Sequence, residues 1–375
     1  MRRLSYLDYN ATAPVRPAVV ETMRATLERT GNPSSVHRFG REARRALEHA
    51  REAVAAMLGA APDQVVFTSG GTEANNQALR SAQGPVVVSA IEHDSVLAAV
   101  PDAARIPVDA EGRVDLAALE QMLAGLAPQL VSVMLANNET GVIQPVREVV
   151  EIARGHGARV HCDAVQAGGK LAIDMAALGA DLLTLSAHKF GGPQGVGALV
   201  VRKGLEPDAL LRGGGQERRW RPGTENLPGI AGFGRACELA MADADWRERT
   251  AALRDHFETR IAQLAPAMRV FGLGAERLPN TSCLTMPGVS NHTQLIEFDL
   301  AGIAVSTGSA CSSGKVGPSH VLAAMGVAPD EAASAIRISL GWASIPDDVD
   351  RFVDAWGRLY VRTRRAAAGA IARPA

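Results

Sequence analysis

Between residues 65 and 201, short continuous apolar segments alternate with segments of helical periodicity. The apolar segments read QVVFTSG, PVVVSA, QLVSVMLA, ARVHCD, DLLTLS and GALVVR. Patterns such as VDLAALEQMLAGL and PVREVVEIARGHG separate them and place apolar residues at helical spacing. Strands that are apolar throughout and alternate with helices are typical of a mostly parallel sheet covered on both faces. The alternation therefore predicts an α/β fold.

A further helix is expected before this region. Residues 34–59 have apolar residues at helical spacing from Phe39 onward, with Ser35 as the expected N-cap and Gly59 as the stop. Together with the strands that follow, this helix predicts a large domain over residues 12–245.

The pattern changes after residue 245. A long charged helix, DWRERTAALRDHFETRIAQLA, leads into separate short strands and helices. We expect a smaller α/β domain made of residues 1–11 and 246–375, packed closely on the large one. The arginine-rich C-terminal segment, VRTRRAAAGAIARPA, is expected to be a frayed tail rather than a binding arm.

Composition excludes several classes of partner. The 375 residues carry a net charge of −1, with 47% hydrophobic and 21% charged residues, which argues against nucleic acid or a membrane surface recognised through bulk charge. The N-terminus lacks the apolar core of a signal peptide, and no segment approaches the ~20 apolar residues of a membrane span. The cysteines form no C-x-x-C pair, so we expect no metal site and reduced thiols in a cytoplasmic protein; they are Cys162, Cys237, Cys283 and Cys311.

Ligands of such sheets bind beyond the carboxyl ends of the strands, so polar residues there are informative. FTSGGTEAN is a strand, two glycines and a helix start, where Gly71 and Thr72 favour a phosphate, although many such turns bind nothing. ARVHCD ends at Asp163, with Gln166 three residues further on and Cys162 as a packing residue. Asp163 is either a site residue or the N-cap of a following helix.

The segment DLLTLSAHKFGG places Ser186, His188 and Lys189 at the end of a buried strand. Burying a lysine is costly, and desolvation lowers its pKa, which is how proteins prepare amines for Schiff bases. The alternative is a lysine that extends its amine to solvent.

These residues form a set. Asp163 precedes Lys189 by 26 residues, and the Gly-Gly helix start lies upstream of both. The set suits pyridoxal phosphate, with Lys189 binding the aldehyde, Asp163 the pyridinium nitrogen and the helix start the phosphate. His93, after the strand PVVVSA, is a candidate to cover the ring, or else a structural histidine.

Arg337 is a second downstream candidate. In AIRISL, Ile336, Ile338 and Leu340 share one face of a strand and leave Arg337 on the other. An arginine held on a strand can bind a carboxylate through two parallel hydrogen bonds, and its alternative is a surface ion pair.

The segment STGSACSSGKVGPSH places Cys311 in a stretch of glycine and serine that we expect to be a poorly ordered loop. A structural cysteine is more often packed on a strand or helix. The residues alone do not say why a thiol lies in such a segment.

The chain resembles the cysteine desulfurases of the NifS/IscS kind, within the class V aminotransferases of pyridoxal phosphate fold type I. The resemblance extends over nearly the whole chain and is carried by YLDYNATAP, GNPSSVHRFGREAR, FTSGGTEANN, EHDSV, NNETGVIQP, HCDAVQ, SAHKFGGPQGVGAL, RPGTEN, GSACSS and IRISLG. It implies a seven-stranded, mostly parallel sheet and a smaller C-terminal α/β domain.

The resemblance also implies roles for individual residues. Lys189 would bind pyridoxal phosphate covalently, Asp163 its ring nitrogen, Gln166 its phenolic oxygen, and His93 would stack on the ring and help to move a proton. The phosphate would be bound by Gly71, Thr72, Ser186 and His188, and by Thr224 of a partner subunit, which implies a homodimer. Asn138 would contact cofactor and substrate, and Arg337 would bind the substrate carboxylate.

By the same resemblance, the activity is conversion of L-cysteine to L-alanine. Cys311 would attack the sulfur as a thiolate, a form that His93 or Lys315 could favour, take the sulfur as a persulfide and pass it to an acceptor or scaffold protein for iron–sulfur cluster or other thio-cofactor assembly. A selenocysteine lyase or a related β-eliminating lyase is the enzymatic alternative, and a non-catalytic binding scaffold is the other.

Overall fold

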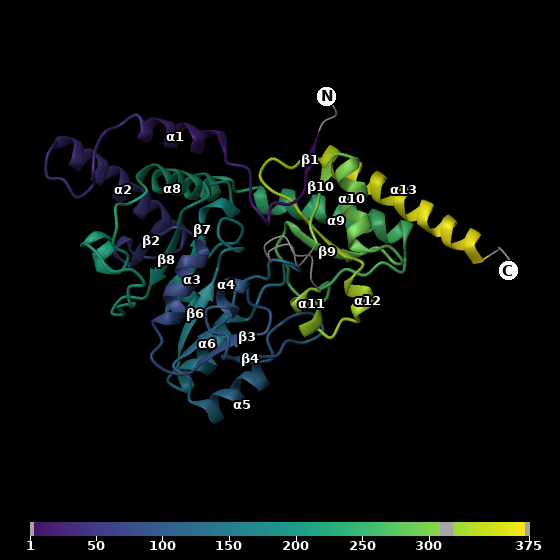
Figure 1. Ribbon diagram of the computed structural model, residues 1–375, viewed down its shortest axis with the longest axis horizontal. Coiled ribbons are helices and arrows are strands. Elements are labelled where there is room, and N and C mark those ends of the chain that lie inside the picture. Colours follow the sequence, from purple (N-terminus) through teal and green to yellow (C-terminus); the bar gives the residue numbers. More distant parts are fainter. Residues whose placement is uncertain (1–3, 308–317, 372–375) are drawn as a thin grey trace.

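The computed structural model describes residues 4–307 and 318–371, and it is built around one seven-stranded sheet (Figure 1). The strand order is β2-β8-β7-β6-β5-β3-β4. Only β8 runs antiparallel to its neighbours, β2 and β7, so the predicted mostly parallel sheet is confirmed. The strands are β2 Val65–Thr68, β3 Val86–Ser89, β4 Ala104–Ile106, β5 Leu130–Ser132, β6 Arg159–Asp163, β7 Leu182–Ser186 and β8 Gly197–Val201.

Helices pack around this sheet through their apolar faces, and the buried side chains of strands and helices form two clusters, which take alternate residues of the strands. Helix α8 packs on α1 and α2 along one side of the sheet (Figure 1), and it is an element that the sequence interpretation lacked. The helices are α1 Pro17–Leu27, α2 Arg38–Met57, α3 Gly71–Arg80, α4 Asp94–Leu97, α5 Leu116–Leu126, α6 Val146–Gly155, α7 Met175–Leu178 and α8 Leu227–Ala242.

The predicted start of α2 is wrong by a few residues. His37, not Ser35, is the N-cap, and its Nδ1 accepts from the backbone N–H of Gly40 at 3.2 Å. The backbone at Ser35 folds over the helix start so closely that a Cβ on Gly40 would lie 2.1 Å from the Ser35 carbonyl oxygen. Phe39, expected on the apolar face, is 58% exposed.

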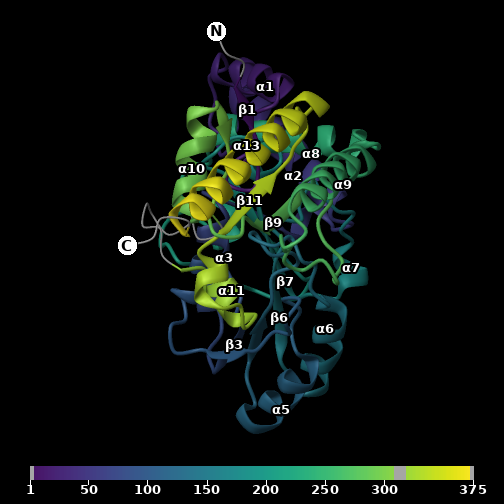
Figure 2. The same ribbon diagram turned by 90° about the vertical axis from the view of Figure 1, so that its right-hand side faces the viewer.

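A second group of elements packs beside the large sheet (Figure 2). Strands β9 and β11 pair antiparallel, and β1 from the N-terminus pairs parallel with β10. A separate core holds them against the helices and includes Phe257, Phe298 and Trp356. The elements are β1 Ser5–Tyr6, α9 Trp246–Leu264, β9 Thr281–Thr285, α10 Asn291–Leu300, β10 Ile303–Ala304, α11 His320–Ala324, α12 Pro329–Ala332, β11 Ala335–Ser339 and α13 Pro346–Ile371.

Helix α13 corrects the expectation of a frayed tail, because it continues through the arginine-rich segment to Ile371. The expected domain boundaries, 12–245 against 1–11 and 246–375, stay a prediction. None of the helices in the described part of the chain combines the length and hydropathy needed to span a bilayer.

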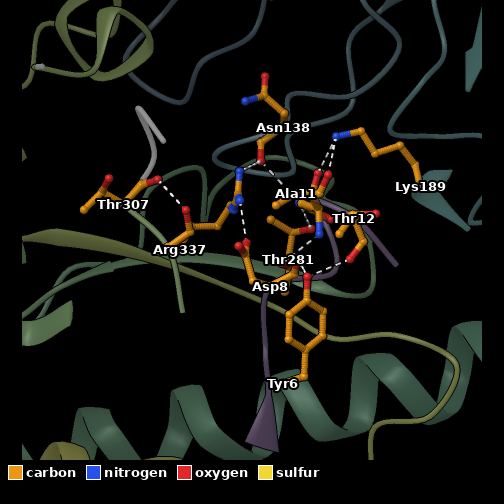
Figure 3. Close-up of polar contacts among 12 residues, drawn as sticks. Tyr6, Asp8, Ala11, Thr12, Asn138, Lys189, Thr281, Thr307 and Arg337 are labelled. Carbon is orange, nitrogen blue, oxygen red and sulfur yellow. Dashed lines mark hydrogen bonds and ion pairs between the residues drawn. The ribbon is translucent and has the colours of Figure 1, made fainter. Parts of the chain in front are cut away.

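The N-terminal segment connects the two groups of elements. After β1, Asp8 forms a bridge with Ser339 at the end of β11, and the chain then crosses to α1 on the large sheet. Residues 8–12 therefore lie between β11 and the carboxyl end of β7 (Figure 3). Residues 8–12, near the N-terminus, thus border the predicted site.

Candidate active site

A cavity of about 250 Å³ lies at the carboxyl ends of the central strands. It gathers nine of the predicted site residues from five separate segments of the chain. These residues are Gly71, Thr72, His93, Asn138, Asp163, Gln166, Ser186, His188 and Lys189.

Helix α3 begins at the wall of this cavity. Its N-cap is Gly70, so no side chain caps the first turn, and Gly71 and Thr72 line the cavity. A Cβ on Gly71 would lie only 2.8 Å from Cγ2 of Val165, so glycine permits the close approach of helix and neighbouring turn. An uncapped helix start of this kind favours an anion such as phosphate.

Asp163 ends β6 and is buried, with 5% of its surface exposed. Its Oδ1 accepts from the backbone N–H of Val165 at 2.9 Å, and its Oδ2 accepts from Nδ2 of Asn75 at 2.8 Å. Residues 165–170 form turns and no helix, so the alternative that Asp163 caps a following helix is wrong. Two donors fix the carboxylate at the cavity wall.

Asn75 connects Asp163 to His93. The negative charge of Asp163 requires the Nδ2 end of the amide to face it, and the same Nδ2 donates to Oγ of Ser95 at 2.8 Å. Ser95 in turn donates its backbone N–H to Nδ1 of His93 at 3.1 Å, and its Oγ lies 2.8 Å from that nitrogen. Nδ1 therefore acts as an acceptor, and in the neutral ring the proton is on Nε2.

Lys189 lies in a 3₁₀ turn, Ala187–Lys189, directly after β7. Its Nζ donates to the backbone carbonyl oxygens of Asn10 at 2.8 Å and Ala11 at 2.9 Å (Figure 3). The amine therefore points at the N-terminal segment along the cavity wall, which gives the solvent-directed alternative no support.

His188 lies beside this lysine. Its Nδ1 is 3.2 Å from Oγ1 of Thr12, and burial, followed by the charge of Lys189, lowers the pKa of His188 to about 4. His188 is therefore neutral near pH 7.

Lys170 is a residue that the sequence interpretation missed. It is 5% exposed, and its Nζ donates to Oδ1 of Asn10 at 2.8 Å and Oε1 of Gln166 at 3.0 Å. Burial holds its pKa well below the usual range, and the charges of Lys189 and Arg337 add to this. The sequence offers only one indication of this contact, the position of Lys170 four residues after Gln166. The same spacing is common in exposed helices, so it does not predict a buried lysine.

Arg337 is fully buried on β11, while Ile336, Ile338 and Leu340 belong to the core of the smaller group of elements, as predicted. Its Nη1 donates to the backbone oxygen of Asn138 at 3.0 Å, and its Nη2 pairs with Oδ1 of Asp8 at 2.7 Å (Figure 3). The ion pair is internal, so the alternative of a surface pair is wrong. Arg337 is not among the residues that line the cavity.

The remaining predicted residues lie elsewhere. Thr224 is exposed and does not line the cavity. Cys311 and Lys315, with the expected disorder around them, lie outside the described residues. The other three cysteines are unpaired and buried, and burial raises the pKa of each thiol; Cys162 is a packing residue as predicted.

The residues present fit pyridoxal phosphate. One wall offers an uncapped helix start for a phosphate, a second a fixed carboxylate for a ring nitrogen, and a third the Lys189 amine for an aldehyde.

The comparisons identify the family. The model of the family "Aminotransferase class-V" matches residues 5–352, and the chain belongs to this family. It is 42% identical over 380 residues to cysteine desulfurase IscS of Dictyoglomus turgidum, covering 97% of this chain and 96% of that protein. It is 45% identical over 367 residues to a cysteine desulfurase of Cereibacter sphaeroides, covering 93% and 94%.

The solved structure of a NifS-like protein from Rickettsia africae has the same fold. It superposes with a TM-score of 0.90 at 37% identity, covering 96% of this chain and all of that one. The resemblance to NifS/IscS-type proteins and the predicted fold class are confirmed.

Proposed function

We propose that this protein is a pyridoxal phosphate-dependent cysteine desulfurase that converts L-cysteine to L-alanine. The observation that carries the proposal is the cavity in which the Lys189 amine, the Asp163 carboxylate and the start of α3 meet. This cavity occurs in a chain whose full-length relatives at 42% and 45% identity are cysteine desulfurases.

Several residues around the cavity hold the cofactor in the proposal. Lys189 binds its aldehyde carbon, and Asp163, fixed by Asn75 and Val165, holds a proton on the ring nitrogen. Bound in this way, pyridoxal phosphate withdraws electrons from the substrate and weakens its carbon–sulfur bond. Gly71, Thr72, Ser186 and His188 bind the phosphate, and a neutral His188 acts there as a hydrogen-bond donor.

The other cavity residues act on the ring and the substrate. Gln166 donates to the phenolic oxygen, and His93 covers the ring with its Nε2 carrying the proton. Asn138 borders both cofactor and substrate. Arg337 attracts the substrate carboxylate through its positive charge. Its guanidinium group contacts the backbone oxygen of Asn138 and also pairs with Asp8.

Cys311 is the sulfur carrier of the proposal. Its thiolate attacks the sulfur of the substrate, the carbon–sulfur bond breaks, and the electron pair left on carbon takes up a proton. L-Cysteine and the enzyme thiol thereby become L-alanine and an enzyme persulfide, without any external oxidant or reductant. The persulfide sulfur then passes to an acceptor or scaffold protein for iron–sulfur cluster or other thio-cofactor assembly.

The proposal includes a cytoplasmic homodimer. Thr224 is exposed on its own subunit and does not line its own cavity, which leaves it available to the phosphate site of a partner. The buried, unpaired state of Cys162, Cys237 and Cys283 supports a reducing compartment.

The test is turnover of L-cysteine by the protein loaded with pyridoxal phosphate. The proposal is supported if alanine and the sulfide released by a reductant form in equal amounts. A protein loaded with the cofactor that forms neither product contradicts the proposal. Selenocysteine measured in parallel separates the alternative, because a selenocysteine lyase would turn over L-selenocysteine and leave L-cysteine almost untouched.

A further inference from the structure

Lys170 is buried beside the cavity, and its surroundings do not match those of an ordinary buried lysine. Such a side chain normally pairs with a carboxylate, because an isolated buried charge is costly. Among the described residues, both hydrogen-bond acceptors of its amine are amide oxygens, Oδ1 of Asn10 and Oε1 of Gln166. The charged groups that face it, Lys189 and Arg337, are cations.

An uncharged amine matches these contacts. It has two N–H groups, and the two acceptors lie at 2.8 and 3.0 Å. Burial and the two neighbouring cations also lower the pKa of Lys170 well below its usual range, which agrees with the geometry.

The contact with Lys170 fixes the amide of Gln166. The amine donates, so the atom that faces it is Oε1, and the opposite end, Nε2, donates to the carbonyl oxygen of Asn10 at 3.0 Å. Because Nε2 carries two N–H groups, one remains available on a side chain that lines the cavity. A flipped amide would put its NH₂ against the amine and its oxygen against the carbonyl.

The same carbonyl oxygen of Asn10 accepts from Nζ of Lys189 at 2.8 Å. Lys170 and Nδ2 of Asn280, the latter at 3.1 Å, both donate to Oδ1 of Asn10, and Oγ1 of Thr281 accepts from Nδ2 of Asn10 at 2.9 Å. Lys170 therefore supports the atom on which Gln166 and Lys189 converge.

We propose that Lys170, as an uncharged amine, is a positioning residue that fixes Gln166 and Asn10 so that an N–H of Gln166 faces the phenolic oxygen of the cofactor. This inference rests on the proposed function, because it needs pyridoxal phosphate in the cavity. Lys170 does not touch the reacting atoms and acts through Gln166.

The test is a titration of the absorbance of the lysine-bound cofactor against pH, without substrate. A hydrogen-bond donor on the phenolic oxygen stabilises the negative charge of that oxygen. The proton on the neighbouring Lys189 nitrogen is then held less tightly, and the midpoint of the titration is lower. Lys170→Met and Gln166→Ala should each raise the midpoint by about 0.5–1 unit, which is the loss of one hydrogen bond of about 1 kcal/mol at 1.36 kcal/mol per unit. Lys203→Met, at an exposed lysine away from the cavity, should leave the midpoint unchanged.

The double variant decides between positioning and a direct effect. If Lys170 acts through Gln166, Lys170→Met adds no shift in the Gln166→Ala background. An additive shift, as removal of a nearby positive charge would give, overturns the proposal, as does an unshifted midpoint in Lys170→Met alone. If Lys170→Met does not fold, Lys170→Gln is titrated in its place with the same criteria. A wild-type protein without lysine-bound cofactor absorbance would instead refute the proposed function itself.

Discussion

Ser95 donates its backbone N–H to Nδ1 of His93 at 3.1 Å, and this contact determines which nitrogen of the imidazole can react. A backbone N–H cannot accept a hydrogen bond, so Nδ1 must offer its lone pair. Asp163 reinforces the arrangement through Asn75, whose Nδ2 donates to Oγ of Ser95. In the resting protein, therefore, Nε2 of His93 carries a proton and acts first as a donor.

Nitrogen-15 NMR of histidine-labelled protein measures this tautomer directly, with His93→Gln to assign the signal. We expect the Nε2-protonated form in the wild type and also in Ser95→Ala, because the alanine keeps the backbone N–H. The lost hydroxyl contact of about 1 kcal/mol should lower turnover by about fivefold. A Nδ1-protonated signal in the wild type would contradict the geometry.

Lys189→Ala should lose both the visible absorbance of the bound cofactor and all turnover, since no other amine contacts the same carbonyl oxygens of Asn10 and Ala11 in the described chain. Absorbance spectra after incubation with pyridoxal phosphate, together with an alanine assay, measure both effects. Lys203→Ala, at an exposed position, is the matched control and should behave as the wild type. Turnover that survives in Lys189→Ala would remove this lysine from the site.

Asp163→Asn should still bind the cofactor but lose about 10²–10³-fold in turnover, the usual cost of removing one preorganised electrostatic group. The asparagine oxygen can still accept from Asn75 or Val165, so the fold should be kept. Cofactor content and rate are measured on the same sample. Near-normal rates at full occupancy would show that the carboxylate is not required.

His161 predicts a pH dependence of stability. Burial lowers the pKa of His161 to about 4, between Oγ of Ser132 and Oγ1 of Thr184. In the unfolded chain His161 binds a proton near pH 6.5, and in the folded protein only near pH 4. The free energy of unfolding is therefore highest above pH 6.5 and falls as the pH decreases from 6.5 to 4.

Urea unfolding between pH 7 and 5 tests this dependence. The contribution of His161 is on the order of 3 kcal/mol when complete, and His161→Gln should flatten the pH dependence of the unfolding free energy. His292→Gln, at an exposed histidine, should keep the wild-type dependence. Equal slopes in wild type and His161→Gln would argue against a neutral buried imidazole.

Periodicity and strand-end residues predicted much of the site, because parallel strands bring their carboxyl ends together whatever the details of packing. Asp163, Lys189 and His93 each follow a strand and therefore had to approach one edge of the sheet. The sheet itself was predictable for the same reason. Its strands are apolar on both faces, a pattern that few other elements share.

Asn10 and Lys170 could not be predicted in this way. Asn10 reaches Gln166 and Lys189 because β1 pairs with β10 near the other end of the chain, a contact that no local pattern records. Lys170 lies in a turn, where its burial depends on Asn10 filling the space beside it. The cap of α2 was misplaced because close packing of Ser35 on Gly40, rather than residue preference, decides where the helix begins.

The most direct test of the account is alanine formation from L-cysteine by the wild type and by Cys311→Ala, with mass spectrometry of the wild-type protein after turnover. We expect alanine only when Cys311 is present, and one added sulfur atom, about 32 Da, on the peptide that contains it. Equal alanine formation by Cys311→Ala, or a wild-type peptide that never gains sulfur, would contradict transfer through this cysteine.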